Sequence, residues 1–136
     1  MRRVTFVVLC LAVGCAEAFA QSQPGPAQLA NPASQNCAAR GGALNMERRP
    51  DGGQYGVCVF TDNYQCEEWA MFRGECPVGG LRVTGYVTPA ARYCAITGGR
   101  YTIVTNSGAA NEQGVCSLPG DKVCSADAYY GGTCGR

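Results

Sequence analysis

Hydrophobic and polar positions alternate in short stretches from residue 43 onward. Leu44 and Met46 alternate with polar residues, a period-two pattern that predicts a β-strand. A Pro-Asp-Gly-Gly turn and a second apolar stretch over 54–60 complete a β-hairpin. The same pattern predicts a second hairpin with strands over 101–105 and 113–118.

A helix-start signal stands before each hairpin. In each signal a capping side chain precedes a proline, which is favoured at the first helical position. The two signals are Asn31-Pro32 and Thr88-Pro89. They predict helices over about 32–40 and 89–97, each followed by a glycine that suits a left-handed C-terminal cap.

Each hairpin is followed by a stretch that predicts a second short helix. In the stretch 67–73, two glutamates place negative charge at the helix N-terminus, and Trp69 and Phe72 lie three residues apart on one face. The counterpart at 125–130 has Asp127 in place of Trp69.

One pattern of cysteines, glycines and prolines occurs twice in the chain. The copies correspond at an offset of 57 residues before the mid-repeat loop and 58 after it, which indicates a tandem duplication. We therefore predict an α+β fold of two tandem disulfide-stapled repeats, each with a short helix, a β-hairpin and a second short helix. The matching cysteines are Cys37, Cys58, Cys66 and Cys76 in the first copy and Cys94, Cys116, Cys124 and Cys134 in the second.

The chain divides into five predicted segments. These are a signal peptide at 1–20, a flexible linker at 21–30, the first repeat at 31–77, a connector at 78–87 and the divergent second repeat at 88–136. Part of the connector alternates in polarity and would add a strand or pack as an ordered link. Each repeat is below the size at which a hydrophobic core alone usually suffices, so disulfides are needed.

The first twenty residues have the form of an export signal. Arg2-Arg3 precede an apolar run, and Ala18-Phe19-Ala20 is a small-residue cleavage site. The run is shorter than a membrane span. A second interpretation makes Cys15 the acylated N-terminus of a lipoprotein, but the usual leucine three residues before it is missing, and we favour cleavage after Ala20. The sequence thus predicts a periplasmic or secreted protein, with a membrane-tethered lipoprotein as the alternative.

The charge balance bears on which partners the chain binds. Once residues 1–20 are removed, basic and acidic side chains are equal in number. No basic cluster supplies the electrostatic footprint of nucleic-acid binding, so we expect no nucleic-acid partner. Beyond the signal no apolar or amphipathic segment is longer than a strand, and we expect no membrane span.

The chain contains no histidine and no Cys-x-x-Cys motif. Without histidine, the usual general base for a serine or cysteine nucleophile is missing. Glu67 and Glu68 are adjacent and point to different sides of a helix, so they cannot form the facing pair of a glycosidase. In an exported chain eight cysteines indicate structural disulfides rather than zinc. We therefore expect no enzyme, no metal and no cofactor.

Five side chains are candidates for contact with a partner: Arg48, Arg49, Tyr64, Trp69 and Phe72. The aromatic ones would form an exposed patch, but we favour the interpretation that Trp69, the only tryptophan, is the main core residue. The two arginines lie at a stapled hairpin tip and resemble the basic loop that an inhibitor offers to a trypsin-like protease. An ordinary solvated turn is the interpretation we favour for them.

The order of motifs in the first copy is specific. It runs from Asn31-Pro32-Ala33-Ser34 with Cys37 and Gly41-Gly42, through Gly53 to Cys58, to Cys66-Glu67-Glu68-Trp69-Ala70 and Cys76. In these motifs the first copy resembles a small family of exported bacterial domains of unknown function, often labelled putative hemolysin. The resemblance implies a location and a fold but no activity, and the hemolysin label has no support in a chain without a membrane-active segment.

The resemblance also implies a disulfide pattern, since some members of the family carry only the first two cysteines. Cys37 would then pair with Cys58 and Cys66 with Cys76, and by repetition Cys94 with Cys116 and Cys124 with Cys134. Four cysteines in each copy permit two other pairings.

The sequence therefore predicts a small exported cysteine-rich protein that acts as a non-catalytic binding or envelope-associated module. Its partner would be an unknown protein or envelope component. The alternative is a protease inhibitor that presents the Arg48-Arg49 loop.

Overall fold

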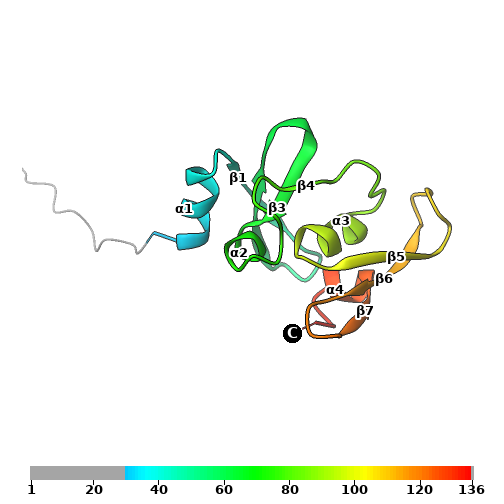
Figure 1. Cartoon of the computed structure of the whole chain (residues 1–136). Coiled ribbons are helices and arrows are strands. Elements are labelled where there is room, and N and C mark those ends of the chain that lie inside the picture. The colour runs from blue at the N-terminus through cyan, green and yellow to red at the C-terminus, as the bar shows by residue number, and fades with distance from the viewer. Residues whose placement is uncertain (1–29, 136) are drawn as a thin grey trace, which may run out of the picture.

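The computed structural model describes residues 30–135, and the predicted signal peptide, nearly all of the predicted linker and Cys15 lie outside this range. The first repeat contains α1 (Pro32–Ala39), β1 (Ala43–Arg48), β2 (Gln54–Val59), a short 3₁₀ turn (Thr61–Asn63), β3 (Tyr64–Glu67) and α2 (Glu68–Phe72). After the short strand β4 (Leu81–Arg82), the second repeat contains α3 (Pro89–Ile96), β5 (Arg100–Thr105), β6 (Gln113–Ser117), β7 (Val123–Ser125) and α4 (Ala126–Tyr130). The mixed α+β fold of two helix-hairpin-helix repeats is confirmed (Figure 1).

The first helix of each repeat begins where the capping signals predict. The Asn31 side chain accepts a hydrogen bond from the Ala33 backbone N–H at 3.0 Å, and Thr88 Oγ1 accepts one from the Ala91 N–H at 3.1 Å. Both helices end before a glycine with positive φ, 80° at Gly41 and 87° at Gly98. Local chemistry therefore determines both ends of these two helices.

A third strand in each repeat was not predicted from the sequence. Antiparallel pairing extends each hairpin by β3 or β7 and places Cys66 opposite Cys58 and Cys124 opposite Cys116. These strands have four and three residues, which is too short to show a clear alternation. The second helix consequently begins one residue later than predicted in each repeat, and the residue before it caps it.

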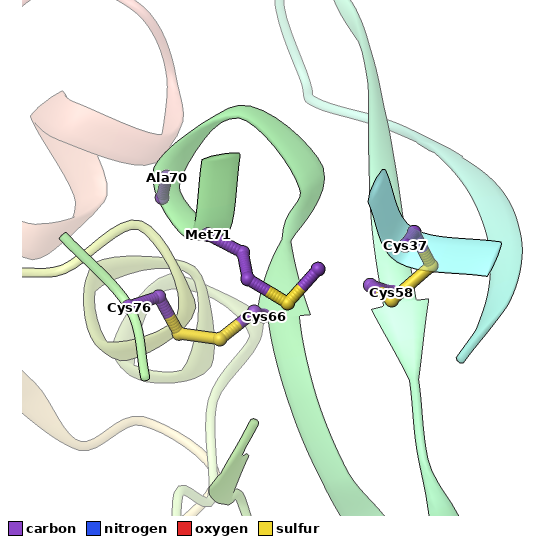
Figure 2. Packing of buried hydrophobic residues seen from close by; sticks show 6 residues of the cluster. All are labelled: Cys37, Cys58, Cys66, Ala70, Met71 and Cys76. Carbon is purple, nitrogen blue, oxygen red and sulfur yellow. A yellow bond between two sulfur atoms is a disulfide. The ribbon is translucent and has the colours of Figure 1, made fainter. Parts of the chain in front are cut away.

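In each repeat one disulfide joins the first helix to the second strand, and another joins the third strand to the loop after the second helix. The bonds are Cys37–Cys58, Cys66–Cys76, Cys94–Cys116 and Cys124–Cys134. These are the pairs that the family resemblance implies. Figure 2 shows the first two bonds, with Met71 packed beside the second.

The second glycine of each Gly-Gly pair has no room for a side chain. A Cβ added at Gly42 would overlap the Sγ atom of Cys58, and one at Gly99 would come within 2.9 Å of Cys94 Sγ. The helix-to-strand disulfide thus lies directly against the backbone that enters the hairpin. The Gly-Gly pair supplies a left-handed cap at its first position and a close approach at its second.

The sheet of the first repeat is covered on both faces. Its strand order is β1-β2-β3-β4, and the face that carries Cys58 and Cys66 packs against α1 and α2. On the other face Tyr55 and Val57 pack against Ile96 and the tyrosines of the second repeat. The three-stranded sheet of the second repeat, β5-β6-β7, carries α3 and α4 on its disulfide-bearing face. Thus α3 lies between the two sheets and joins the repeats.

The connector is ordered and takes part in this packing. Leu81 and Arg82 form β4, which pairs with β3, and Val83 is 5 % exposed within the shared core. One of the two outcomes predicted for this segment, an added strand, is therefore observed at Leu81 and Arg82.

We predict that Ile96→Ala destabilises the whole protein because Ile96 is fully buried between the repeats. Truncation of such a residue costs about 2–5 kcal/mol in free energy of unfolding. Urea unfolding without reductant, followed by fluorescence and circular dichroism, measures this cost.

The matched control is Ile103→Ala, which truncates an isoleucine that is 46 % exposed on β5. It should change stability by less than about 1 kcal/mol, as surface substitutions usually do. Equal losses for the two variants would contradict a core shared by the repeats.

Candidate functional site

A cleft with a volume of about 410 Å³ lies between the two repeats. Its walls come from the hairpin tip and the end of α2 in the first repeat, and from α3, α4 and the β6–β7 turn in the second. The charged lining residues are Arg49, Glu67, Arg73, Glu75 and Lys122, and the tyrosines are Tyr55, Tyr93 and Tyr129. Neither repeat alone provides these walls, so the cleft is a product of the duplication.

Arg49 points from the hairpin tip into this cleft. Its Nη2 donates to Asp51 Oδ2 at 3.0 Å, and its guanidinium lies 5.9 Å from the centre of the Tyr93 ring. The side chain is only 10 % exposed. An inhibitory loop must present its basic side chain to the protease, so this arrangement opposes the protease-inhibitor alternative. Arg48 is exposed, but its carbonyl accepts a hydrogen bond from the Tyr130 hydroxyl at 3.5 Å.

Glu67 lines the cleft from the N-terminus of α2. One carboxylate oxygen accepts the backbone N–H of Trp69 at 3.1 Å and the other accepts that of Ala70 at 2.7 Å. Burial raises the pKa of the Glu67 carboxyl above its ordinary value, although the two backbone N–H groups and nearby Arg73 favour the charged form. This residue was predicted as a helix N-terminal charge, and the structure adds its position at the cleft.

The other charged groups lie at the rim. Arg73 Nη2 lies 2.7 Å from Glu75 Oε2, and Arg73 Nε donates to the same oxygen at 3.0 Å. Lys122 approaches from the β6–β7 turn, next to the apolar side chains of Leu118 and Pro119. The rim therefore offers both signs of charge beside a small apolar wall.

Three tyrosines form the inner wall. Tyr93 packs edge-on against Tyr55 at 5.0 Å between ring centres and lies 5.1 Å from Tyr129. Burial is the largest cause that raises the pKa of both Tyr93 and Tyr129, so their hydroxyls stay protonated at neutral pH. The wall is thus aromatic with neutral hydroxyl groups.

The aromatic candidates from the sequence lie elsewhere. Trp69 is 38 % exposed and Phe72 is 48 % exposed, and their rings meet edge-on at 5.7 Å on α2. The interpretation of Trp69 as the main core residue is therefore wrong, because disulfides and Met71 fill that place. Tyr64 contacts Arg82 instead, whose guanidinium lies 5.7 Å from its ring centre.

Most cleft residues were missed by sequence reasoning. Glu67, Arg73, Lys122 and Tyr129 come from different elements, and only the packing of the second repeat against the first sheet brings them together. One signal in the sequence could have revealed this packing. The strand β2 is apolar on both of its faces, which indicates a sheet covered on two sides.

Glu68 forms a second polar feature on the opposite side of α2. It is 4 % exposed, and its carboxylate accepts hydrogen bonds from Asn31 Nδ2 at 3.1 Å and from Ser34 Oγ at 2.5 Å. These contacts join the start of α1 to the start of α2. The equivalent positions of Ser34 and Glu68 in the second repeat are Ala91 and Ala126, so both partners are absent there together. This explains why the Asn-Pro-Ala-Ser and Glu-Glu-Trp-Ala motifs belong together.

A polar cluster also joins the repeats. Arg92 on α3 pairs with Glu47 on β1 and donates to Gln65 Oε1 at 2.7 Å, while the Tyr55 hydroxyl donates to Glu47 at 2.7 Å. Burial raises the pKa of Glu47, but the hydrogen bonds from Arg92 and Tyr55 outweigh burial and hold it below its ordinary value.

The described residues also bear on metal ligands, membrane spans and the redox environment of the protein. Within residues 30–135 no three His, Cys, Asp or Glu side chains are grouped as metal ligands. In the same range no helix is long and apolar enough to cross a membrane. The four disulfides are typical of an oxidising environment outside the cytoplasm.

These features define a class of protein, a small tandem-repeat α+β module stapled by disulfides. The chain belongs to the family described as a domain of unknown function (DUF333), which matches residues 28–75 and again 85–133. It is 34 % identical over 83 residues to the uncharacterized protein YoaF of Escherichia coli K12 and of Shigella flexneri. That match covers 98 % of the relative but 58 % of this chain. No solved structure matches the chain.

We predict that Ser34→Ala destabilises the protein by about 1–3 kcal/mol, because it leaves the buried Glu68 carboxylate short of a donor. Thermal and urea unfolding without reductant give the value. Ser107→Ala, at an exposed turn of the second repeat, is the control and should change little. If Ser34→Ala also changed little, the Glu68 contacts would not stabilise the fold.

We predict a pH signature for the cluster that joins the repeats. Because the folded pKa of Glu47 is lowered, its contribution is present above the ordinary pKa of glutamate and is lost as pH falls through the folded pKa. The stability advantage of the wild type over Glu47→Gln should therefore shrink between neutral pH and about pH 3.

Urea midpoints across that range measure the difference between the two proteins. The raised pKa of Glu67 lowers stability as pH rises, but it does so equally in the wild type and in Glu47→Gln, so its effect cancels in the difference. An Arg92→Gln background should remove most of the pH-dependent difference, and an unchanged difference there would exclude Arg92 as its source.

Proposed function

We propose that this protein is an exported, non-catalytic binding module whose ligand site is the cleft between the repeats. The observation that carries the proposal is the cleft itself, about 410 Å³ in volume and lined by charged and tyrosine side chains from both repeats. Ligand sites usually have about 300–1,000 Å³ and a few convergent polar groups, and they favour the boundary between structural units.

The bonding of the cleft carboxylates supports binding over catalysis. Glu67 caps α2 through both oxygens, and Glu75 is paired with Arg73. Each carboxylate is thus engaged in a structural contact, whereas a general base needs a free approach to the proton that it removes. Two disulfides within each repeat restrain that repeat's own wall of the cleft, which lowers the entropy cost of ordering it on binding.

The export part of the proposal is supported by the disulfides and the signal-like N-terminus. In such a setting the partner is a small molecule, a protein or another component of the envelope or the surrounding fluid. The near balance of charge accords with a partner other than nucleic acid.

A second candidate surface is the exposed pair of Trp69 and Phe72 on α2. Tryptophan and other aromatic residues are enriched where proteins contact partners, and this pair is absent from the second repeat, where Asp127 and Tyr130 stand. The pair would serve a protein partner rather than a small ligand.

We predict that immobilised protein spanning residues 21–136 captures a specific ligand from an envelope extract or culture fluid. Arg73→Ala should lose the ligand because it removes a cation from the rim of the cleft. The Arg73 side chain is 51 % exposed, so the substitution should hardly affect folding. Arg82→Ala, which removes an exposed arginine outside the cleft, is the matched control and should retain the ligand.

Trp69→Ala separates the two surfaces. Loss of the ligand in this variant alone would move the site to the aromatic pair. Capture of nothing by correctly oxidised protein would contradict the binding-module proposal.

A further inference from the structure

We propose that the sulfur atom of Cys134 is a site of thiol–disulfide exchange. A small thiol opens the Cys124–Cys134 bond there and leaves the other three disulfides intact. Opening this bond releases the segment 131–135, here called the latch, from the wall of the cleft. The site follows from the unequal exposure of the bonded cysteines, and it exists whether or not the cleft binds a ligand.

Among the disulfide-bonded cysteines of residues 30–135, Cys134 differs from the rest in its exposure. The other seven are at most 3 % exposed, whereas Cys134 is partly exposed. A thiolate opens a disulfide by reaching one of its two sulfur atoms, so the rate of exchange depends on access to that atom. Its bonded partner Cys124 is 3 % exposed, so attack falls on Cys134 and Cys124 is the leaving group.

The equivalent bond of the first repeat is protected by the packing of the repeats. Cys66–Cys76 spans the same 10 residues as Cys124–Cys134, but Cys76 is only 2 % exposed. The chain just after α3 packs on the residue before Cys76, since a Cβ added at Gly98 would lie 2.6 Å from the Glu75 carbonyl oxygen. Within residues 30–135 no third unit packs on the latch in this way. The tandem arrangement therefore covers one of two equivalent bonds and leaves the other accessible.

The exchange with a small dithiol has two steps. A thiolate of the reagent bonds to Cys134 Sγ, the Cys124–Cys134 bond breaks, and Cys124 leaves as a thiolate that takes up a proton. The second thiolate of the reagent then attacks the reagent's own bonded sulfur, which closes a disulfide within the reagent and releases Cys134 as a thiolate that is protonated in turn. The protein gains two electrons and two protons, and the dithiol loses the same number. A monothiol at low excess leaves a mixed disulfide on Cys134.

The latch lies on the wall of the cleft. Gly135 is one of the lining residues, and a Cβ added there would lie 2.6 Å from Cδ2 of the Tyr129 ring. Besides the disulfide, the backbone N–H groups of Thr133 and Cys134 hold the latch by donating to the Ala128 carbonyl oxygen at 2.9 Å and 3.1 Å. These two hydrogen bonds share one acceptor at an exposed position, so the latch opens locally once the covalent bond is broken.

The first test measures which bond a dithiol opens in the folded protein. Oxidised protein of residues 21–136 is treated with dithiothreitol without denaturant, quenched with N-ethylmaleimide at a series of times, and mapped by peptide mass spectrometry. Cys124 and Cys134 should be alkylated at least about tenfold faster than the other six cysteines, because exchange follows access. Equally fast alkylation of Cys66 and Cys76 would overturn the proposal.

The second test identifies the sulfur atom that is attacked. Glutathione, a monothiol, replaces dithiothreitol, and N-ethylmaleimide traps the thiol that leaves. The mapped peptides should carry glutathione on Cys134 and the maleimide on Cys124. Glutathione mainly on Cys124 would contradict the assignment. Protein unfolded in urea is the control, in which all four bonds are accessible and the preference for this one bond should disappear.

The third test follows the latch by amide hydrogen exchange in the ¹⁵N-labelled double variant Cys124→Ser, Cys134→Ser. The amide of Thr133 should exchange at least about tenfold faster than in the wild type, and the signal of Thr97, which lines the cleft, should shift. Val57 in the first sheet should keep its exchange rate. An unchanged Thr133 would show that the bond does not hold the latch, and faster exchange at Val57 would show that it holds the whole fold. Either result overturns the release of the latch, and wild type reduced only at this bond repeats the measurement without a substitution.

Discussion

The contact of a disulfide with a glycine backbone is the constraint on which each repeat depends. In the first repeat, four of the six residues of one buried cluster are half-cystines, and the bond from α1 to β2 lies against Gly42. A unit of this size does not usually bury enough apolar area to fold without disulfides or another constraint. Closing loops of 21 and 22 residues, one in each repeat, destabilises the unfolded chain by about 3 kcal/mol each through lost conformational entropy.

The second repeat buries apolar side chains of the first repeat that its own small core leaves uncovered. It covers the outer face of the first sheet with α3, so that Val57 is fully buried, while its own outer face is left open. The positions that match Tyr55 and Val59 are Gln113 and Ser117. Gln113 and Ser117 make this face more polar than its counterpart in the first repeat, as the outer faces of capping units are in longer repeat proteins. The cleft exists because two similar units are packed in this unequal way.

Features set by local chemistry could be predicted from the sequence, and features set by packing could not. Asn31 and Thr88 act through their side chains on the neighbouring backbone, and the Gly-Gly pairs act through their own backbone, so helices and hairpins were found near their observed bounds. The exposure of Trp69 depends on cystines that take the core position, and the third strands are too short to show a period. The cleft residues come from elements far apart in the chain, and no local pattern joins them.

The order of the disulfides along the chain has a consequence for how the protein matures. Each bond joins consecutive cysteines of the repeats, at sequence separations of 21, 10, 22 and 10 residues. When such a chain enters an oxidising compartment with its N-terminus first, both members of a pair arrive before the next cysteine does. Native pairing then coincides with the order of arrival. Oxidation can then proceed along the chain without forming wrong disulfides. The protein avoids the reshuffling of wrong bonds, which takes seconds to hours.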